Sequence, residues 1–208
     1  MRPVDENIKN LIFDFGGVII NIDFNLTFNA FSELGVADVA TVWKKSVASG
    51  LMADFEKGNV SPGEFRKKMD EFTGLGLSEA EFDKAWNSMI LDVPLERVKL
   101  IERLKKNYRI YLLSNTNKIH YDYYFSVIEN FGYKKIDDLF NRAFFSFRMG
   151  KVKPDLTIYN EVLEKERLVA CETLFIDDIQ ENISGAEKAG IKGLLINPGT
   201  LTEIFSEF

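Results

Sequence analysis

Cysteine is almost absent from this chain of 208 residues, in which Cys171 is the only one. A single cysteine excludes an internal disulfide and is typical of proteins from a reducing compartment. The sequence around Cys171 holds no histidine and no second cysteine, so we expect an ordinary thiol rather than a nucleophile. Histidine is as rare, since His120 is the only one. We expect a packing or surface role for it, although a contact with substrate is an alternative.

Long apolar runs are also missing. No stretch approaches the roughly 18 apolar residues that a membrane-spanning helix requires, and residues 1–7 lack the apolar segment of a signal peptide. The net charge of −6 argues against nonspecific binding to nucleic acid, which requires a basic surface. We therefore expect a cytoplasmic protein that binds neither membrane nor nucleic acid, and nothing in the sequence indicates a specific protein partner.

The remaining composition is that of an ordinary globular protein. Hydrophobic residues make up 46% of the chain and charged residues 28%, which are usual fractions. The length favours one large domain, or a core with an inserted module. The 18 phenylalanines predict a large aromatic-rich core.

Two parts of the chain differ in their hydrophobic pattern. After a first apolar strand at residues 11–14, residues 18–20 read as a short extended flap. From residue 95 onward, amphipathic helices alternate with short apolar strands, which predicts an α/β fold with a parallel sheet and right-handed crossovers. The expected helices are 95–106, 118–131, 156–165 and 179–189, and the expected strands are 108–113, 140–147, 173–176 and 193–196.

The segment between these parts has a purely helical pattern. Apolar residues recur at helical spacing from residue 24 to residue 92, without strand-like alternation. Ser61 with Glu64, and Ser78 with Glu81, form the pattern of a capping box at the start of a helix. We expect a bundle of about four helices here. The predicted domains are therefore an α/β core of residues 1–22 and 93–208, and an inserted helical domain of residues 23–92.

Polar residues follow several of the apolar runs. They are Asp14, the pair Ser114 and Asn115, Lys153, and the pair Asp177 and Asp178. Loops that leave the carboxyl ends of parallel strands converge on one crevice. An acid, a hydroxyl, a base and an acidic pair in this order predict a site for a phosphate and a divalent metal.

Asp14 and the acidic pair are the candidates for the central chemistry. Asp14 precedes Gly16 and Gly17, which keep the backbone open to a ligand, so Asp14 is a candidate nucleophile toward phosphorus. A plain turn-capping role for Asp14 is the alternative. Asp177 and Asp178 repel each other unless a cation lies beside them, and Mg²⁺ prefers such oxygen ligands. The alternative for Asp178 is to cap the helix that starts near residue 179.

The other two segments are weaker signals by themselves. Ser114 and Asn115 offer a hydroxyl and backbone N–H groups to a phosphoryl oxygen, but short polar residues also suit an ordinary strand-to-helix turn. Lys153 can neutralise a transferring phosphoryl group, although most lysines are solvated surface residues.

Together the four segments resemble the motifs of the haloacid dehalogenase-like (HAD) hydrolase superfamily: a nucleophile loop, a Ser/Thr, a Lys and an acidic pair. The resemblance covers essentially the whole chain and implies a Rossmann-like sheet with a mobile α-helical cap, here residues 23–92. Response-regulator receivers are look-alikes, but they carry their acidic pair near the start of the chain and have no cap. Residues 14–18, 21–25 and 114–117, with His120, resemble a subgroup of sugar-phosphate phosphatases that includes alpha-glucose-1-phosphate phosphatase.

The resemblance also implies a role for each matching residue. Asp14 is then the nucleophile and a metal ligand, Gly16 offers its backbone carbonyl to Mg²⁺, and Asp178 and Asp177 complete the metal site. Asn182 supports these carboxylates.

For the phosphoryl group, the resemblance implies that Ser114 and Asn115 bind its oxygens and that Lys153 neutralises its charge.

One position departs from the superfamily pattern. Most of its phosphatases carry a second aspartate two residues after the nucleophile, which acts as general acid and base, and here that position is Gly16. General acid–base help is typically worth about 10²–10⁴-fold in rate. Asp23 and Glu56 are candidate substitutes, but a surface or capping role is the default for each. If that default holds, Glu56→Gln leaves activity untouched.

The predicted function is that of a Mg²⁺-dependent phosphatase that hydrolyses a small phosphomonoester, a sugar phosphate in the first instance, through an aspartyl-phosphate on Asp14. A dehalogenase needs no metal, so Asp177 and Asp178 argue against that activity. A phosphomutase usually keeps the second aspartate, so Gly16 argues against that one. A binding or regulatory protein without turnover is a further alternative, and Gly16 is its only support.

Overall fold

The sheet of the protein is parallel throughout and has five strands. The computed structural model describes residues 5–206, apart from the side chain of Phe125. The strand order is β3-β2-β1-β4-β5, and in the central strand Phe13 lies opposite Leu112 on one side and Ile176 on the other. The strands are β1 (Asn10–Phe13), β2 (Arg109–Ser114), β3 (Arg142–Phe145), β4 (Thr173–Asp177) and β5 (Lys192–Leu195). The predicted α/β class with a Rossmann-like parallel sheet is confirmed.

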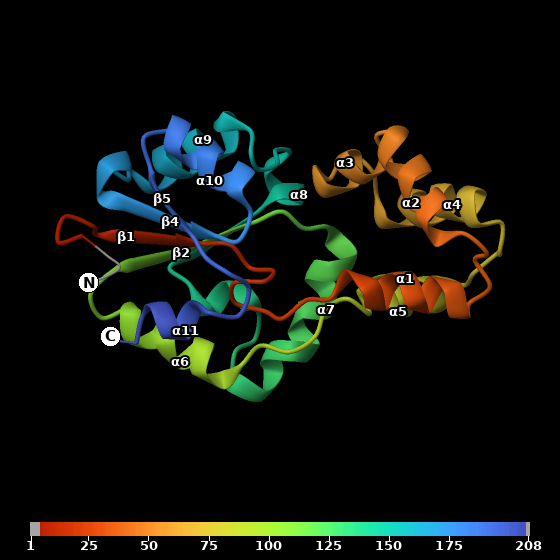
Figure 1. Cartoon of the computed structure of the whole chain (residues 1–208), viewed down its shortest axis with the longest axis horizontal. Coiled ribbons are helices and arrows are strands. Elements are labelled where there is room, and N and C mark those ends of the chain that lie inside the picture. The colour runs from red at the N-terminus through yellow and green to blue at the C-terminus, as the bar shows by residue number, and fades with distance from the viewer. Residues whose placement is uncertain (1–4, 207–208) are drawn as a thin grey trace.

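Helices cover both faces of this sheet. Successive residues of a strand point to opposite faces, so Leu11 and Phe13 pack in one apolar cluster and Ile12 packs in another. The first cluster includes residues of α6 (Leu95–Leu104), α7 (Lys118–Ile128) and α11 (Leu201–Ile204). The second includes residues of α9 (Leu156–Glu166) and α10 (Gln180–Lys188). Figure 1 shows α9 and α10 above the sheet and α6 and α11 below it.

Four short helices complete this part of the chain: α8 (Ser146–Met149), η1 (Glu129–Phe131), η2 (Ile136–Leu139) and η3 (Ala170–Glu172). Residues near the end of the chain pack against the sheet, because Leu201 and Phe205 are fully buried in the first cluster.

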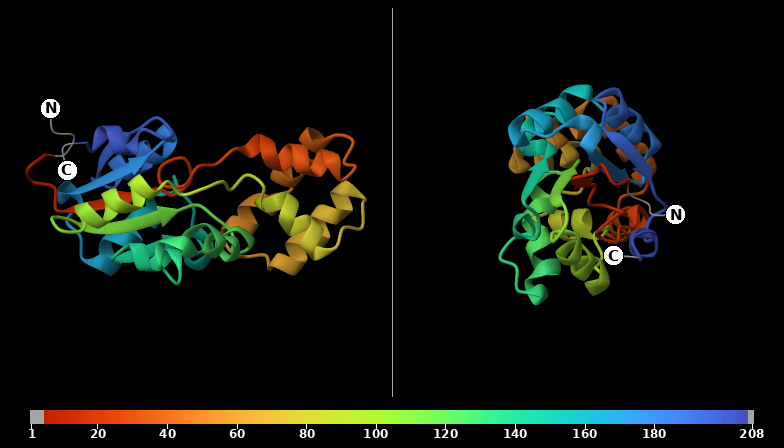
Figure 2. Two further views of the ribbon diagram at one scale, coloured as in Figure 1. Left: turned by 90° about the horizontal axis from the view of Figure 1, so that it is seen from below. Right: turned by 90° about the vertical axis from the view of Figure 1, so that its left-hand side faces the viewer.

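The helices that precede α6 form a second body beside the sheet. We call them the helical segment: α1 (Phe24–Glu33), α2 (Val39–Ala48), α3 (Leu51–Glu56), α4 (Pro62–Thr73) and α5 (Glu79–Asn87). They lie at one end of the sheet in Figure 1 and in the left view of Figure 2. Their apolar cluster is separate from those of the sheet. It also includes Ile119 of α7.

The helix count and the helix starts test the sequence pattern directly. Both capping boxes are present, at Ser61 with Glu64 and at Ser78 with Glu81. The expectation of about four helices is wrong by one, because Gly50 adopts φ +78 and separates α2 from α3. A glycine accepts this left-handed conformation without steric cost.

Two chain passages join the helical segment to the rest. They run side by side, with Ile22 paired to Ile90 in an antiparallel bridge and the Asn21 amide donating to the Asp92 carbonyl at 2.9 Å. The expected extended flap at residues 18–20 is a tight turn instead. The amides of Ile19 and Ile20 both donate to the carbonyl of Phe15, at 2.9 Å each, since burial of these apolar side chains favours a compact turn.

Among the described residues, we find no helix with both the length and the apolar character that crossing a membrane requires.

Candidate active site

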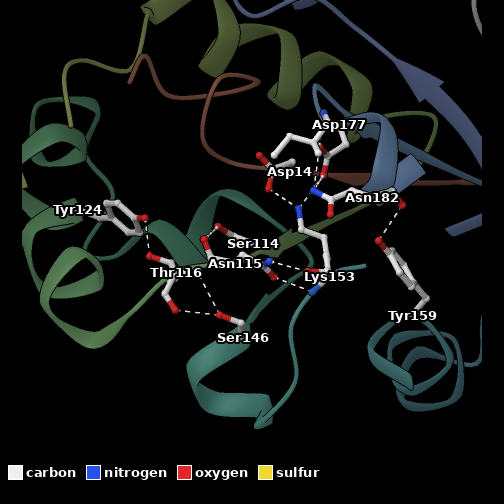
Figure 3. A network of polar contacts seen from close by, with 11 residues as sticks. Asp14, Ser114, Asn115, Thr116, Tyr124, Ser146, Lys153, Tyr159, Asp177 and Asn182 are labelled. Carbon is white, nitrogen blue, oxygen red and sulfur yellow. Dashed lines mark hydrogen bonds and ion pairs between the residues drawn. The ribbon is translucent and has the colours of Figure 1, made fainter. Parts of the chain in front are cut away.

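The predicted site residues meet at one edge of the sheet. Asp14 directly follows β1, Ser114 ends β2 and Asp177 ends β4. Because these neighbouring strands are parallel and in register, their carboxyl ends lie together. Lys153 arrives from the loop after α8, and Figure 3 shows its side chain pointing to Asp14 and Asp177. A cavity of about 560 Å³ opens here, and its lining includes Asp14, Gly16, Ser114, Asn115, Lys153 and Asp178.

Lys153 is the cation at the centre of this group. Its Nζ donates to Asp14 Oδ1 at 2.5 Å and to Asp177 Oδ2 at 2.7 Å. Its side chain is 1% exposed and that of Asp177 is 0% exposed. Burial by itself lowers the pKa of Lys153, but the charges and hydrogen bonds of the two carboxylates outweigh it, so the pKa is raised. Lys153 is therefore a fixed positive charge in the cavity wall and not a solvated surface lysine.

Asp177 is held by donors from the helix that follows it. Its Oδ1 accepts from the Ile179 amide at 2.8 Å, and Asn182 Nδ2 reaches Oδ1 and Oδ2 at 3.1 Å and 3.0 Å. The capping alternative raised for Asp178 therefore does not describe this turn. The N-cap residue of α10 is Ile179, and the carboxylate that receives an amide there belongs to Asp177.

The carboxylate of Asp178 lies against the turn after β1. A Cβ added at Gly17 would lie 2.4 Å from Asp178 Oδ2, and Gly17 has φ +76. Only a residue without a side chain leaves room for a carboxylate at this position. The glycine after Gly16 thus gives Asp178 access to the group around Asp14.

Three carboxylates come close enough to share a cation. Asp14, Asp177 and Asp178 each present an oxygen, and these oxygens lie within 4.8 Å of one another. Burial raises the pKa of Asp14 to about 7, with Lys153 opposing and Asp177 contributing. Burial, followed by the charge of Asp177, also raises the pKa of Asp178. A hard divalent cation relieves this repulsion and favours the ionised forms, so the donor set fits such an ion.

Asn115 uses its side chain to position Lys153. Its Nδ2 donates to the Lys153 carbonyl at 2.9 Å, and its Oδ1 accepts from the Lys153 amide at 2.8 Å. This paired contact fixes the backbone from which the lysine side chain extends. The sequence did not reveal it, because the two residues lie 38 positions apart.

A second polar network supports the loop after β2. Ser146 Oγ accepts from the Thr116 amide at 2.9 Å and donates to the Thr116 carbonyl at 2.8 Å. Thr116 Oγ1 lies 2.7 Å from the hydroxyl oxygen of Tyr124. All three residues are buried, and Figure 3 shows them beside Ser114 and Asn115. Local sequence patterns did not indicate this network, which ties β2 to the start of α8.

The two candidate substitutes for an acid at position 16 differ in location. Asp23 is the N-cap of α1, where its Oδ1 accepts from the Asn25 amide at 2.9 Å, so the default role expected for it is confirmed. Glu56 is half-buried and lines the cavity that Asp14 and Lys153 also line. The surface or capping role expected for Glu56 stays a prediction, and its place in the cavity wall keeps the alternative of a role in the reaction.

His120 is a buried residue of the cavity wall. Its Nδ1 lies 2.9 Å from Asn87 Oδ1, and its ring stacks on that of Trp86 with centroids 5.4 Å apart. Burial lowers the pKa of His120 to about 3, so the ring is neutral at physiological pH. An amide oxygen only accepts, so Nδ1 carries the proton and Nε2 is the acceptor. The expected packing role is present, and the position in the cavity wall keeps the alternative of a substrate contact.

The helical segment contributes a mainly apolar wall to the cavity. Its lining residues from this segment and from the passages that join it are Ile22, Phe24, Thr27, Trp43, Val47, Met52, Phe55, Glu56, Trp86, Met89 and Ile90. The hydroxyl of Thr27 donates to the Trp86 carbonyl at 3.1 Å. Glu56 is therefore the charged residue of this wall, opposite the polar floor formed by the strand ends.

Comparisons with known proteins agree with this arrangement. Residues 8–190 match the family model described as haloacid dehalogenase-like hydrolase. D-ribitol-5-phosphate phosphatase of Bacteroides thetaiotaomicron is 34% identical over 185 residues, which cover 89% of this chain and 90% of that protein. Sesquiterpene phosphatase astK of Aspergillus oryzae is 26% identical over 205 residues, which cover 93% of this chain and 92% of that protein.

Solved structures of other proteins share the fold of this chain. A HAD-family enzyme of Bacteroides thetaiotaomicron, in complex with magnesium and inorganic phosphate, superposes with a TM-score of 0.84 at 35% identity, covering 92% of this chain and 96% of that one. A 2-haloacid dehalogenase of Pseudomonas syringae shares the fold, with a TM-score of 0.63 at 17% identity over 96% of this chain and 99% of that one. The chain is thus an enzyme that belongs to the haloacid dehalogenase-like hydrolase family.

Proposed function

We propose that this hydrolase is a Mg²⁺-dependent phosphatase that cleaves a small phosphomonoester through an aspartyl-phosphate on Asp14. The observation that carries the proposal is a cluster of three carboxylates beside one buried lysine. The carboxylate oxygens lie within 4.8 Å of one another, and Lys153 forms an ion pair with Asp14. A cation at the carboxylates and the ammonium of Lys153 together neutralise a dianionic phosphoryl group. The phosphatase names of the relatives and the magnesium and phosphate complex support this reading.

In this proposal, each residue of the site has a separate role. Asp14 attacks phosphorus, and Lys153 balances the charge that the phosphoryl oxygens carry during transfer. Mg²⁺ would be held by Asp14, Asp178, the Gly16 carbonyl and Asp177, and when bound it polarises the phosphoryl group as a Lewis acid. Asn182 orients Asp177 through the hydrogen bonds to both carboxylate oxygens.

We assign the phosphoryl oxygens to Ser114 and Asn115. Because the Asn115 side chain is engaged by Lys153, we propose that Asn115 acts on the substrate through its backbone N–H. Ser114 is 2% exposed, ends β2 and lines the cavity. Its hydroxyl can therefore donate to a phosphoryl oxygen that is bound there.

We further propose a division into two domains, with residues 1–22 and 93–208 as core and residues 23–92 as cap. The separate apolar cluster of the helical segment supports this division, as do the two adjoining chain passages at residues 21–23 and 89–92. In such an arrangement the cap closes over the substrate and excludes water.

A sugar or polyol phosphate is the first candidate substrate class, in line with the subgroup that includes alpha-glucose-1-phosphate phosphatase. The D-ribitol-5-phosphate phosphatase relative supports it. The Nε2 acceptor of His120 can receive a hydrogen bond from a substrate hydroxyl in the cavity.

The phosphate ester of an apolar alcohol is a second candidate, favoured by the apolar wall. Val47, Phe55 and Ile90 offer no hydrogen-bond partner to a hydroxyl group, and an unpaired buried hydroxyl costs about 1–3 kcal/mol. The sesquiterpene phosphatase relative supports this class.

The test is phosphate release from a panel of polyol phosphates, sugar phosphates and prenyl or alkyl phosphates, in Mg²⁺ and in EDTA. We expect release that requires Mg²⁺ and disappears in Asp14→Asn. Asp23→Asn is the matched control, because it makes the same chemical change at a helix cap and leaves turnover intact. The best substrate class decides between the two candidates. A wild-type protein that binds Mg²⁺ but hydrolyses no member of the panel would instead support a binding or regulatory role.

A further inference from the structure

Position 16 carries no side chain, and a Cβ there would have one close neighbour. A Cβ added at Gly16 would lie 3.1 Å from the Ile22 Cδ1 methyl, closer than ordinary van der Waals contact. This methyl ends a flexible side chain and would have to shift by a few tenths of an ångström to admit the Cβ. Because Gly16 itself carries no side chain, an acid that serves the leaving group must come from another part of the chain.

Glu56 reaches the same cavity from the opposite side. It is the last residue of α3, and the cavity that it lines also contains Asp14 and Lys153. The carboxylates of Glu56 and Asp14 both lie near enough to the Tyr124 hydroxyl that their charges contribute to raising its pKa, after the larger effect of burial. Glu56 and Asp14 therefore line one cavity, to which Glu56 comes from the helical segment.

The end of α3 is fixed on both sides of Glu56. Phe55 is 1% exposed and its ring stacks on that of Phe65, with centroids 3.8 Å apart. Gly58 has φ +70, and a Cβ there would lie 2.1 Å from the Phe147 carbonyl oxygen. Gly58 therefore lets the turn after α3 pack directly on the backbone of α8. These two contacts hold Glu56 toward the cavity when the helical segment is closed.

Two opposing effects act on the pKa of Glu56. Burial raises its pKa, and the charge of Lys153 opposes the rise. The other titratable side chains that line the cavity are Asp14, His120, Tyr124, Lys153, Asp178 and Glu181. His120 is neutral at physiological pH, and burial raises the pKa of Tyr124, so neither is the ready proton donor near pH 7.

We propose that Glu56 is the general acid and base of the reaction, supplied by the helical segment in place of a side chain at position 16. The inference rests on the proposed phosphatase function. In the first step an Asp14 oxygen forms a bond to phosphorus, the bond from phosphorus to the leaving oxygen breaks, and the proton of the Glu56 carboxyl passes to that oxygen.

The second step returns the proton. The Glu56 carboxylate takes a proton from a water molecule, whose oxygen forms a bond to phosphorus while the bond to Asp14 breaks. Phosphate and the alcohol are the products, and Glu56 is protonated again. Because Glu56 belongs to the helical segment, acid–base help is present only when this segment lies against the sheet. A substrate is then cleaved only in the closed, water-excluding arrangement.

Glu56→Gln, compared on two leaving groups, tests the proposal. An alkyl phosphate needs a proton on its leaving oxygen, whereas p-nitrophenyl phosphate releases a stable anion without one. We expect kcat/KM, which reports the first chemical step, to fall by about 10²-fold or more on the alkyl phosphate. On p-nitrophenyl phosphate we expect a loss at least tenfold smaller, with a burst of p-nitrophenol as the second step becomes limiting. Retained kcat/KM on the aryl ester also shows that the variant is folded.

Asp54→Asn is the matched control, since Asp54 is exposed on the same helix, and it should change neither value. An equal loss on both esters would assign Glu56 a structural role and overturn the proposal, as would an unchanged kcat/KM on the alkyl ester. Failure of the phosphatase function itself has a different signature. In that case the wild-type protein releases no phosphate from either ester, or Asp14→Asn retains activity.

Discussion

The single histidine gives the folded protein a predictable sensitivity to acid. His120 is 8% exposed, its Nδ1 contacts Asn87 Oδ1 and its ring stacks on Trp86. Burial lowers its pKa from 6.5 to about 3. Below pH 6.5 the unfolded chain therefore binds a proton that the folded chain does not bind. The free energy of unfolding must decrease as the pH falls from 6.5 toward the folded pKa.

The size of this effect depends little on how low the folded pKa lies. Between pH 7.5 and pH 5.0 the contribution changes by about 1.4 kcal/mol for each pH unit below 6.5, or about 2 kcal/mol in total. Asp14, Glu56 and Asp178 have raised pKa values and act with the opposite sign. Their contributions are common to wild type and variant, so they cancel when the two proteins are compared.

The comparison uses His120→Gln, which cannot bind a proton in this range. We expect urea unfolding in EDTA, followed by tryptophan fluorescence, to show that the stability difference between wild type and variant shifts by about 2 kcal/mol in the variant's favour from pH 7.5 to pH 5.0. Any constant cost of the substitution appears at both pH values and does not affect the shift. An unchanged difference would mean that His120 takes up its proton in the folded state, and the reasoning from burial would be refuted.

Three further substitutions test the geometry of the site. Lys153→Met leaves the carboxylates of Asp14 and Asp177 without their ammonium partner, and we expect a loss of about 3–5 kcal/mol in EDTA that Mg²⁺ partly restores, as measured by urea unfolding. Gly17→Ala places a Cβ against Asp178 Oδ2 and should weaken Mg²⁺ binding in calorimetry. An affinity equal to that of wild type would contradict this. Asn115→Ala removes the paired contact with the Lys153 backbone. We expect the free energy of unfolding to fall by about 1–3 kcal/mol and kcat to decrease. A variant as stable and as active as wild type would show that the contact is dispensable.

The sequence predicted the features that short segments encode. The strands β1, β2 and β4 contain buried apolar runs, and the parallel register then brings the residues at their ends to one edge. Asp14, Ser114 and Asp177 could therefore be assigned to a common crevice before any coordinates were known. The starts of α4 and α5 were also predictable, because a capping box lies within four residues.

The features that the sequence did not predict depend on contacts between distant segments. The paired hydrogen bonds between Asn115 and Lys153 span 38 residues, and the contact of Ser146 with Thr116 spans 30. Both contacts join the loop after β2 to the segment after β3. Periodicity identifies which face of a helix is apolar, but it does not say where the end of a short helix such as α3 points. The sequence therefore did not show that Glu56 lines the cavity.

The location of Glu56 changes the meaning of Gly16. In sequence, a glycine in place of an acid looks like the loss of a catalytic group, and it supported the reading of a protein without turnover. In the fold, Ile22 occupies the space beside Gly16, while a carboxyl group enters the same cavity from the helical segment. Asp14 directly follows β1 and Lys153 lies in the loop after α8, so neither belongs to the helical segment. In the mechanism that we propose, Glu56 couples proton transfer to closure of the helical segment, so the apolar wall and the acid reach the leaving group together.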